Sequence, residues 1–398
     1  MLVYKIKFVA AFGLVCFILF SCTKNNGGAS SSVVVASSSN LIQFVFTSDP
    51  HYGLKKATFQ GVSNVDAAIV NAALVNKLNT LNGITLPYDS GVQAGKNIGF
   101  VDCVITGGDI ANREESISNI QSATASWNQF STDYITSLNL TDRNKQKTAL
   151  YIVPGNHDVS NSIGYYASMT PPTDPSSMVG MYNLMMNPIV AKNGATYNYV
   201  TDKVHYSKDI QGIHFVFLNL WPDSLERVWM NKDLQNVNSI TPVFLFMHSI
   251  PNVEARFFTN PNGTQNINAT DKFENLLSEV FKDGAKNINV TATIEQKGFT
   301  DFLKVHPNIK AFFHGHNNYN QYYVWQGPDI DISLNCYRAD SPMKGSVSAS
   351  DETKLSFQFV TVDTTTKNMT VRECLWNATP SNPASAVTWG ASITVSLK

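Results

Sequence analysis

The stretch Tyr151-Ile-Val-Pro-Gly-Asn-His-Asp158 joins a short β-rich run to three consecutive polar side chains. The Pro-Gly pair in its middle ends the strand and lets the backbone turn sharply. An amide, an imidazole and a carboxylate therefore follow one another at the carboxyl end of a strand, where open α/β sheets keep their binding sites. Taken alone, these residues are also compatible with an ordinary polar turn that carries a surface histidine. The surrounding chain decides between the two interpretations.

Two earlier stretches have the same design. Leu41–Ser48 is β-branched and aromatic and runs into Asp49-Pro-His51, and Val101–Thr106 runs into Gly107-Gly-Asp109. Segments with the apolar spacing of helices separate these strands, at residues 65–81 and 114–137. Alternating strands and helices predict parallel strands joined by crossover helices. The three polar clusters are therefore expected at one edge of a sheet.

The second half of the chain adds two further clusters after apolar runs. Pro242–Met247 ends at His248, and Ile309–Phe313 ends at His314-Gly-His-Asn-Asn318. More strands are expected at residues 197–200, 204–208, 214–220, 321–325, 329–335, 355–362 and 369–375, and helices at 224–237, 270–283 and 292–305. Residues 159–196 have no clear period and predict a long loop beside the site. The C-terminal part is thus expected to be rich in strands.

The residues that follow these strands are of the types that bind metal ions: Asp49, His51, Asp109, Asn156, His248 and His316. Carboxylate, imidazole and amide groups without thiolates suit hard or borderline divalent ions. Two such ions about 3.5–4 Å apart hold the attacking and the leaving oxygen of a phosphoryl displacement. They also lower the pKa of a bound water far below its bulk value. The pattern therefore favours a metal-dependent hydrolase.

The spacing of these motifs resembles that of a known enzyme family. Asp49-x-His51, Gly108-Asp109, Gly155-Asn-His-Asp158, His248 and Gly315-His316 match, in this order, the motif series of the calcineurin-like metallophosphoesterases. The resemblance covers residues 41 to about 375. It implies an α/β fold, a four-layer αββα sandwich of two mixed β-sheets flanked by helices. It also implies a phosphoester hydrolase in which a metal-bridged hydroxide attacks phosphorus.

The resemblance also implies a role for each matched residue. The site would hold two divalent ions, such as manganese, iron or zinc. Asp49 and His51 would bind the first ion, and Asp109 would bind both. Asn156, His248 and His316 would bind the second ion. His157 would contact the phosphate and protonate the leaving oxygen rather than bind metal. Two roles stay open for Asp158, which either orients that imidazole or caps the turn.

Some positions depart from the family pattern. Many members end the last motif with a second histidine, where this chain has Asn318, so either its oxygen is a weaker ligand or water takes the place. Purple acid phosphatases carry a tyrosine where this chain has Asn112, so a ferric charge-transfer site is not expected. Arg113 occupies the position of the phosphate-binding arginine of the protein-phosphatase branch. The alternative for Arg113 is a surface residue neutralised by the two glutamates that follow it.

Other histidines do not follow this pattern. His205 and His214 fall in expected strands away from the clusters, which predicts packed, hydrogen-bonded side chains. His314 adjoins a ligand motif without occupying a matching position, so a supporting contact is the alternative to simple packing.

The N-terminal residues 1–22 predict an export signal. Two lysines precede a 13-residue apolar run, Phe8–Phe20, which is too short to span a bilayer as a helix. Leu19-Phe-Ser-Cys22 resembles a bacterial lipobox, which implies a lipid on Cys22 and a lipoprotein of the cell envelope that is anchored to a membrane. Secretion into the periplasm or medium is the alternative. Residues 23–40 predict a flexible tether, and residues 41–398 the metallophosphoesterase domain.

Composition narrows the possible partners. The chain has 398 residues and a net charge of −1, which gives no support for nucleic-acid binding. The expected partners are a small phosphorylated substrate and, through the lipid, a membrane. Cys103, Cys336 and Cys374 remain after the signal, and an odd number indicates no disulfide framework, although one pair stays open. The sequence does not choose between phosphomonoesters and phosphodiesters. A non-catalytic surface lipoprotein and, through Arg113, a protein phosphatase are the alternative functions.

Overall fold

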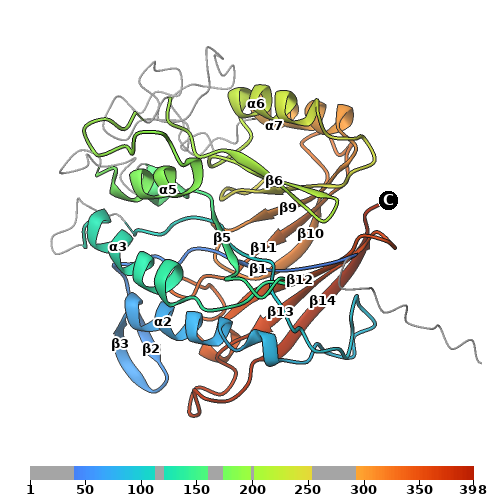
Figure 1. Cartoon of the computed structure of the whole chain (residues 1–398). Coiled ribbons are helices and arrows are strands. Elements are labelled where there is room, and N and C mark those ends of the chain that lie inside the picture. Colours follow the sequence, from blue (N-terminus) through green and yellow to red (C-terminus); the bar gives the residue numbers. More distant parts are fainter. Residues whose placement is uncertain (1–39, 113–120, 160–173, 199–200, 253–292) are drawn as a thin grey trace, which may run out of the picture. The chain divides into compact units, whose positions relative to one another are not determined.

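The computed structural model describes residues 40–112, 121–159, 174–198, 201–252 and 293–398 (Figure 1). All of them belong to one compact unit, Ala36–Lys398. The expected signal peptide with Cys22, nearly all of the tether, and the helix expected at 270–283 lie outside the described residues. Within these ranges, no helix is both long enough and apolar enough to cross a membrane.

The first of two large sheets contains six strands in the order β14-β13-β12-β1-β4-β5. Their bounds are Leu41–Thr47 for β1, Cys103–Thr106 for β4, Ala149–Ile152 for β5, Ser356–Asp363 for β12, Asn368–Leu375 for β13 and Thr388–Ser396 for β14. β1 pairs in parallel with β4, and β4 with β5, whereas β12, β13 and β14 add antiparallel pairs. The sheet is therefore mixed, and its parallel part carries the first three polar clusters.

The second sheet also contains six strands, in the order β10-β11-β9-β8-β7-β6. The bounds are Tyr206–Ile210 for β6, Ile213–Phe217 for β7, Val243–Phe246 for β8, Ile309–His314 for β9, Gln321–Trp325 for β10 and Leu334–Arg338 for β11. The neighbours β7, β8, β9 and β11 run in parallel, and the strands at both edges run antiparallel to them. The second sheet is mixed as well.

The two sheets pack face to face through aromatic side chains. Phe44 of β1 makes edge contacts with Phe215, Phe246 and Phe313, which come from three strands of the second sheet, at ring-centroid distances of 5.4, 5.8 and 5.6 Å. Successive residues of a strand point to opposite faces. In β8 the phenylalanines therefore face the first sheet, whereas Val243 and Leu245 belong to a second buried cluster on the outer face of the second sheet.

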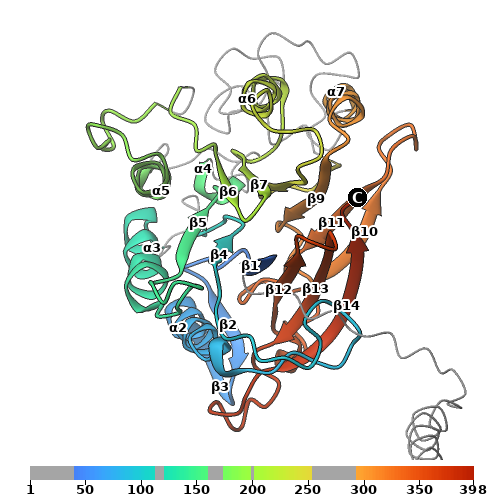
Figure 2. The ribbon, with the colours of Figure 1, turned by 45° about the vertical axis from the view of Figure 1, so that its right-hand side comes forward.

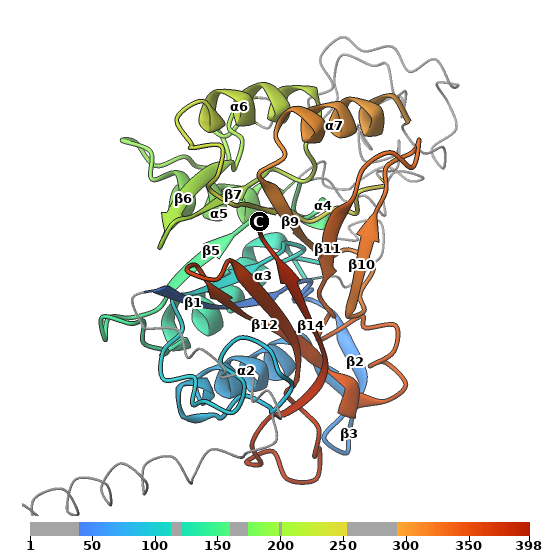
Figure 3. The same cartoon turned by 90° about the vertical axis from the view of Figure 1, so that its right-hand side faces the viewer.

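Helices cover the outer faces of both sheets (Figures 2 and 3). The helices beside the first sheet are α2 (Ala67–Leu78), α3 (Ala123–Phe130) with a following π-helical turn (Ser131–Ser137), and α5 (Ser176–Met186). Those on the second sheet are α6 (Ser224–Leu234) and α7 (Thr293–Val305). Met230 of α6 and Phe299 of α7 pack on Leu245 of β8 in one buried cluster. The expected four-layer arrangement of helix, sheet, sheet and helix is confirmed.

Short elements complete the described part of the chain. These are the hairpin β2 (Lys55–Phe59) and β3 (Val62–Asp66), the turn α4 (Asn156–Val159), and the 3₁₀ turns Leu81–Gly83 and Glu352–Lys354. The hairpin was not expected, and it corrects the start of the first helix from residue 65 to Ala67. Gln60 and Gly61 have φ values of 50° and 78°, which suit a tight hairpin turn. Pairing with β2 holds residues 62–66 in an extended conformation.

The loop expected over residues 159–196 is wrong for residues 176–186, which form α5. This segment is rich in methionine and contains no charged residue, so its sequence shows no polar face from which a period could be read. The helix is fixed by packing instead. Gly180 lies against the Trp127 ring of α3, where a Cβ atom would overlap the indole.

Strand boundaries show further corrections. β14 was not expected, because it is a largely exposed edge strand rich in serine, threonine and glycine. β11 begins at Leu334 rather than residue 329, and β6 begins at Tyr206. Residues 197 and 198 are not in a strand, and residues 199–200 lie outside the described part. Cys103, Cys336 and Cys374 are buried and unpaired.

Candidate metal centre

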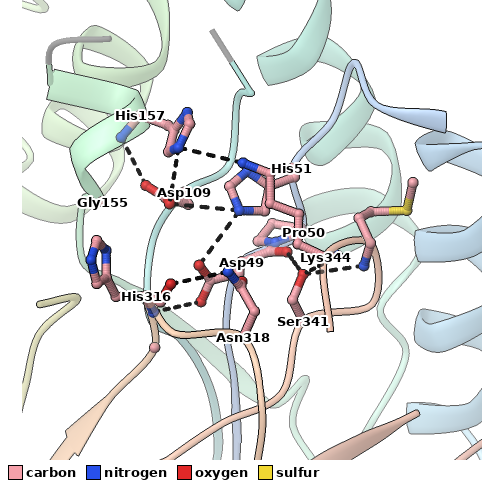
Figure 4. A network of polar contacts seen from close by, with 12 residues as sticks. Asp49, Pro50, His51, Asp109, Gly155, His157, His316, Asn318, Ser341 and Lys344 are labelled. Atoms are coloured by element: carbon pink, nitrogen blue, oxygen red, sulfur yellow. Dashed lines mark hydrogen bonds and ion pairs between the residues drawn. The ribbon is translucent and has the colours of Figure 1, made fainter. Parts of the chain in front are cut away.

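The polar clusters meet because the parallel strands end in register. Thr47, the last residue of β1, pairs with Thr106 of β4, which in turn pairs with Ile152 of β5. In the second sheet, Phe246 at the end of β8 pairs with Phe313 of β9. Each chain segment then leaves its sheet at the same edge. The loops that follow carry the expected ligand residues of both sheets into one region (Figure 4).

Backbone hydrogen bonds hold these loops together. Asp49 N–H donates to the Gly108 carbonyl at 3.0 Å, and His51 N–H donates to the Asp109 carbonyl at 3.0 Å. The second sheet is joined to the first through His316, whose N–H donates to Asp49 Oδ2 at 3.1 Å. The site therefore lies where loops of both sheets contact one another.

The side chains form two overlapping groups of possible ligands. His51, Asp109 and His157 make one group, and Asp49, Asp109 and His248 make the other, with ligand atoms in each group within 4.8 Å of one another. All five residues are buried. Asp109 belongs to both groups, which is the position that the sequence resemblance implies for a residue between two metals.

Asp109 Oδ2 lies close to ligand atoms of two histidines. It is 3.6 Å from His51 Nε2 and 3.2 Å from His248 Nε2. His51 Nε2 is also 3.5 Å from Asp49 Oδ1. Expected ligands from three separate loops thus point toward one another, as Figure 4 shows for Asp49, His51 and Asp109.

Asn156 and His316 lie on the side of His248. His316 Nδ1 is 2.9 Å from Asn156 Oδ1 and 3.3 Å from His248 Nε2. His316 therefore contacts both of the other residues that the resemblance assigns to the second metal. Their donors are two imidazole nitrogens and an amide oxygen.

Several atoms of this site are buried and, within the described ranges, have no hydrogen-bond partner: Asp49 Oδ1, His51 Nε2 and Asn318 Oδ1. A buried polar atom left without a partner costs about 1–3 kcal/mol. Divalent ions would satisfy all three atoms, and oxygen and imidazole donors are the types such ions bind. The residues present therefore fit the metal pair that the motifs imply.

His248 is oriented by a backbone contact on its other ring nitrogen. Its Nδ1 lies 2.7 Å from the Gly107 carbonyl oxygen, to which it donates, so Nε2 is left facing Asp109. A carbonyl partner of this kind fixes the tautomer and orientation of a metal-binding histidine. The sequence motif contains Gly107 but gives no sign of this contact.

The ligand loops have an unusual backbone conformation. Asp49, His51, Asp109, His316 and Asn318 all have positive φ values, between 42° and 71°. Asn, Asp and His adopt this region more readily than most residues, and such strain concentrates at functional sites. All five residues lie within four residues of the end of β1, β4 or β9.

Two motif glycines permit the close approach of these loops. A Cβ on Gly155 would overlap the carboxylate of Asp109, and a Cβ on Gly108 would overlap the backbone of Pro154 and Gly155. Gly108 also has a φ of 89°. The chain reversal after β5 therefore requires glycine at the point where it contacts the loop of Asp109.

Charges within the site perturb the pKa values of its groups. Burial would raise the pKa of Asp109, but the positive charge of His248 and the other imidazoles outweighs it and holds that pKa well below its usual range. Burial would lower the pKa of His248, but Asp109 and Asp49 outweigh it and raise the pKa to about 9. For His51 and His157, burial dominates and lowers the pKa, assisted by the charge of Lys344.

His157 lies beside the centre. Its backbone N–H donates to Asp109 Oδ1 at 2.8 Å, and its ring meets that of His51 edge to face at 5.0 Å. His157 Nε2 is 3.9 Å from Asp109 Oδ2. His157 is therefore placed for either of two roles. It belongs to the first group of possible metal ligands, and the resemblance implies that it is an acid that does not bind metal.

Asp158 does not contact the imidazole through its hydrogen bonds. Its Oδ2 accepts from Gly155 N–H at 2.9 Å and from Ile110 N–H at 3.1 Å, and its Oδ1 accepts from Ala111 N–H at 3.1 Å. Of the two roles left open by the sequence, these contacts match the cap of the turn. Burial raises the pKa of Asp158 to about 7, despite these hydrogen bonds.

The structure describes Asn318 but not Arg113, the two further residues that the sequence singled out. Asn318 Nδ2 donates to the His316 carbonyl at 3.0 Å, which leaves Oδ1 as the atom available to a metal. Arg113 lies outside the described residues, together with the start of the helix expected at 114–137. The described helix there begins at Ala123, where Ser122 Oγ accepts from Ala125 N–H at 3.1 Å.

Three further histidines have hydrogen-bond partners, which the sequence predicts for His205 and His214. His205 Nδ1 lies 2.9 Å from Glu226 Oε1. His214 lies between Asp209 and Asp233, with nitrogen–oxygen distances of 2.7 and 2.8 Å. His314 is buried, and its Nε2 contacts the Tyr323 hydroxyl at 2.8 Å.

Sequence reasoning missed the loop that follows β11. Ser341 Oγ donates to the Asp49 carbonyl at 2.8 Å, and Lys344 Nζ lies 3.5 Å from His157 Nε2 (Figure 4). Neither residue belongs to a motif or follows an expected strand directly. Only the pairing of β11 beside β9 brings this loop to the site.

No family model matches the chain, and no curated protein does. Solved structures do match. One is a conserved uncharacterized protein, described as a predicted phosphoesterase, from Streptococcus pneumoniae TIGR4, with 8% identity and a TM-score of 0.31 over 89% of this chain and 98% of that one. Another is the calcineurin-like phosphoesterase YfkN from Bacillus subtilis, with 11% identity and a TM-score of 0.30 over 90% of this chain and 91% of that one.

Proposed function

We propose that this chain is a metal-dependent phosphoesterase of the calcineurin-like type, which hydrolyses a phosphomonoester or phosphodiester at a centre of two divalent ions. One observation carries the proposal. Two buried groups of ligand atoms share Asp109, and buried donor atoms around it lack partners within the described ranges. The order of the sequence motifs and the four-layer fold support the same assignment.

The residues divide into those that hold metal and those that act beside it. Asp49, His51, Asp109, Asn156, His248 and His316 would hold the two ions, with Asn318 as a further oxygen donor. When bound, the ions would polarise a phosphate oxygen and lower the pKa of a water molecule. All of these ligands except His316 and Asn318 are buried, and burial strengthens the electrostatic attraction between a ligand and a metal ion.

His157 is the candidate acid for the leaving group. Its Nε2 would hold a proton for the departing oxygen, a contribution of about 10²–10⁴ in rate. Its backbone N–H bond to Asp109 fixes it beside the centre. Asp158 would act indirectly, by holding the turn on which His157 lies.

The test compares metal content and hydrolysis in the same preparations. The wild-type protein, purified without chelator, is expected to contain one to two transition ions per chain and to hydrolyse an aryl phosphate. Asp109→Asn should lose most of both, because it removes charge from both ligand groups. Asp351→Asn is a matched control, since Asp351 caps an exposed 3₁₀ turn.

The outcomes separate the alternatives. Fewer than one ion per chain together with no hydrolysis of mono- or diesters would contradict the proposal and favour a non-catalytic binding module. Hydrolysis of phosphopeptides in preference to small esters would favour a protein phosphatase. Metal without ester hydrolysis would also contradict the enzyme assignment.

We propose further that the protein is an envelope lipoprotein. The support is the sequence Leu19-Phe-Ser-Cys22 after an apolar run. Expressed in a bacterial host, the full chain should partition into detergent and Cys22→Ser should not. Equal partitioning of the two would contradict lipid anchoring.

A further inference from the structure

A lysine from outside the motifs reaches the candidate centre. Lys344 lies in the loop after β11, and its Nζ is 3.5 Å from His157 Nε2, the atom proposed to hold the proton for the leaving group. Figure 4 shows its side chain running to His157, across the ring of His51. The amine thus reaches the part of the site where a substrate oxygen would meet His157.

The backbone of Lys344 is fixed to a metal-binding loop. Ser341 Oγ accepts from Lys344 N–H at 2.9 Å and from Met343 N–H at 3.2 Å, and it donates to the Asp49 carbonyl at 2.8 Å. One hydroxyl therefore connects the start of the lysine side chain to the first expected ligand. This connection fixes the backbone of Lys344 beside the loop that carries Asp49.

A second hydrogen bond joins the loop after β11 to the loop after β9 of the second sheet. Ser346 N–H donates to the Asn318 carbonyl at 2.7 Å. Between these two connections, Gly345 packs so closely that a Cβ atom would overlap Ser348 Oγ and Asp340 Oδ1. The loop is therefore held on both sides of Lys344, which is the arrangement expected of a positioned group rather than of a surface lysine.

A lysine ammonium group in this position is suited to binding a phosphate group. Lysine binds phosphate as a compact point charge with three donors. A phosphomonoester carries about −1.5 to −2 charges near pH 7, because its second pKa is about 6. A phosphodiester carries a single negative charge and places a second substituent where the monoester has a charged oxygen. A fixed ammonium group therefore discriminates between the two.

We infer, resting on the proposed function, that Lys344 binds a non-bridging phosphate oxygen beside His157 and makes the site select phosphomonoesters over phosphodiesters. The oxygen that the lysine binds is the third non-bridging oxygen of the monoester, which a diester replaces with its second ester oxygen.

The experiment compares Lys344→Met and Lys344→Arg with the wild-type protein. Lys55→Met is the matched control, because Lys55 is half-exposed and pairs with Asp66 at 3.0 Å in the β2–β3 hairpin. The substrates are 4-nitrophenyl phosphate and bis(4-nitrophenyl) phosphate. Inorganic phosphate binding to the metal-loaded proteins is measured by calorimetry, and metal content by elemental analysis.

Lys344→Met should raise KM for the monoester and the Kd of inorganic phosphate by about tenfold, the loss typical of one charge-assisted hydrogen bond. KM for the diester should change less than about threefold, and metal content should be unchanged. Lys344→Arg should recover most of the phosphate affinity. Lys55→Met should behave as wild type in every measurement.

Three results would overturn the inference: unchanged phosphate affinity in Lys344→Met, equal effects on both esters, or an effect that follows a change in metal content. A wild-type protein that binds phosphate through Lys344 but hydrolyses neither ester would instead remove the proposed function and keep the phosphate site.

Discussion

The carboxylate of Asp158 accepts a hydrogen bond from the backbone N–H of Gly155 at 2.9 Å and so closes the turn that presents His157. Two more backbone N–H groups, of Ile110 and Ala111, donate to the same carboxylate from the loop of Asp109. One buried side chain therefore joins the turn after β5 to the loop after β4.

We expect Asp158→Ala to lower the free energy of unfolding by ~2–4 kcal/mol, because it leaves buried backbone donors without their acceptor. Urea denaturation followed by circular dichroism measures the change. Asp351→Ala removes an exposed cap and should cost ~1 kcal/mol or less. Normal stability of Asp158→Ala with an altered pH dependence of hydrolysis would instead support the role of orienting His157.

The surroundings of His214 allow a prediction of how the free energy of unfolding depends on pH. Burial would lower the pKa of His214, but hydrogen bonds and charges from Asp233 and Asp209 outweigh it and raise the pKa above its usual value of 6.5. A raised pKa in the folded state stabilises the fold below the unfolded-state pKa. That stabilisation is lost as the pH rises through the folded-state pKa.

The loss of stability on His214→Gln should therefore be larger at pH 5.5 than at pH 9. Denaturant midpoints of the wild type and the variant at both pH values measure this difference. His306→Gln should not reproduce it, because burial lowers the pKa of His306. If the difference in denaturant midpoint between wild type and His214→Gln is the same at both pH values, Asp209 and Asp233 do not raise the pKa of this histidine.

The sequence was most informative where strand and turn chemistry coincide. Apolar runs that stop at Asp49, Asp109 and His248 predicted parallel strands that end in ligands. The register of β1 with β4 places the first two ends together, and His248 reaches them from the second sheet, with its Nε2 3.2 Å from Asp109 Oδ2. Local composition suffices there, because a buried strand and its terminating turn are both encoded by neighbouring residues.

Tertiary contacts account for what the sequence did not predict. α5 depends on Trp127 packing against Gly180, and Lys344 reaches His157 because β11 pairs beside β9. Neither relationship leaves a period or a motif in the neighbouring residues. The exposed edge strand β14 was missed for a related reason, since it has few apolar residues and is formed by pairing with β13.

Gly155→Ala tests whether the centre requires the close approach of two loops. A methyl group at this position would overlap the carboxylate of Asp109, so the turn after β5 must move away from the loop after β4. We expect a loss of ~1–3 kcal/mol in the free energy of unfolding, as is typical of overpacking, together with a loss of bound metal.

Gly83→Ala is the matched control, because nothing within 4 Å would meet its Cβ and its backbone does not require glycine. Thermal unfolding and elemental analysis of both variants make the comparison. Gly155→Ala with wild-type metal content and stability would mean that the carboxylate of Asp109 can move without consequence. In that case Asp109 would not be the residue on which both ligand groups depend.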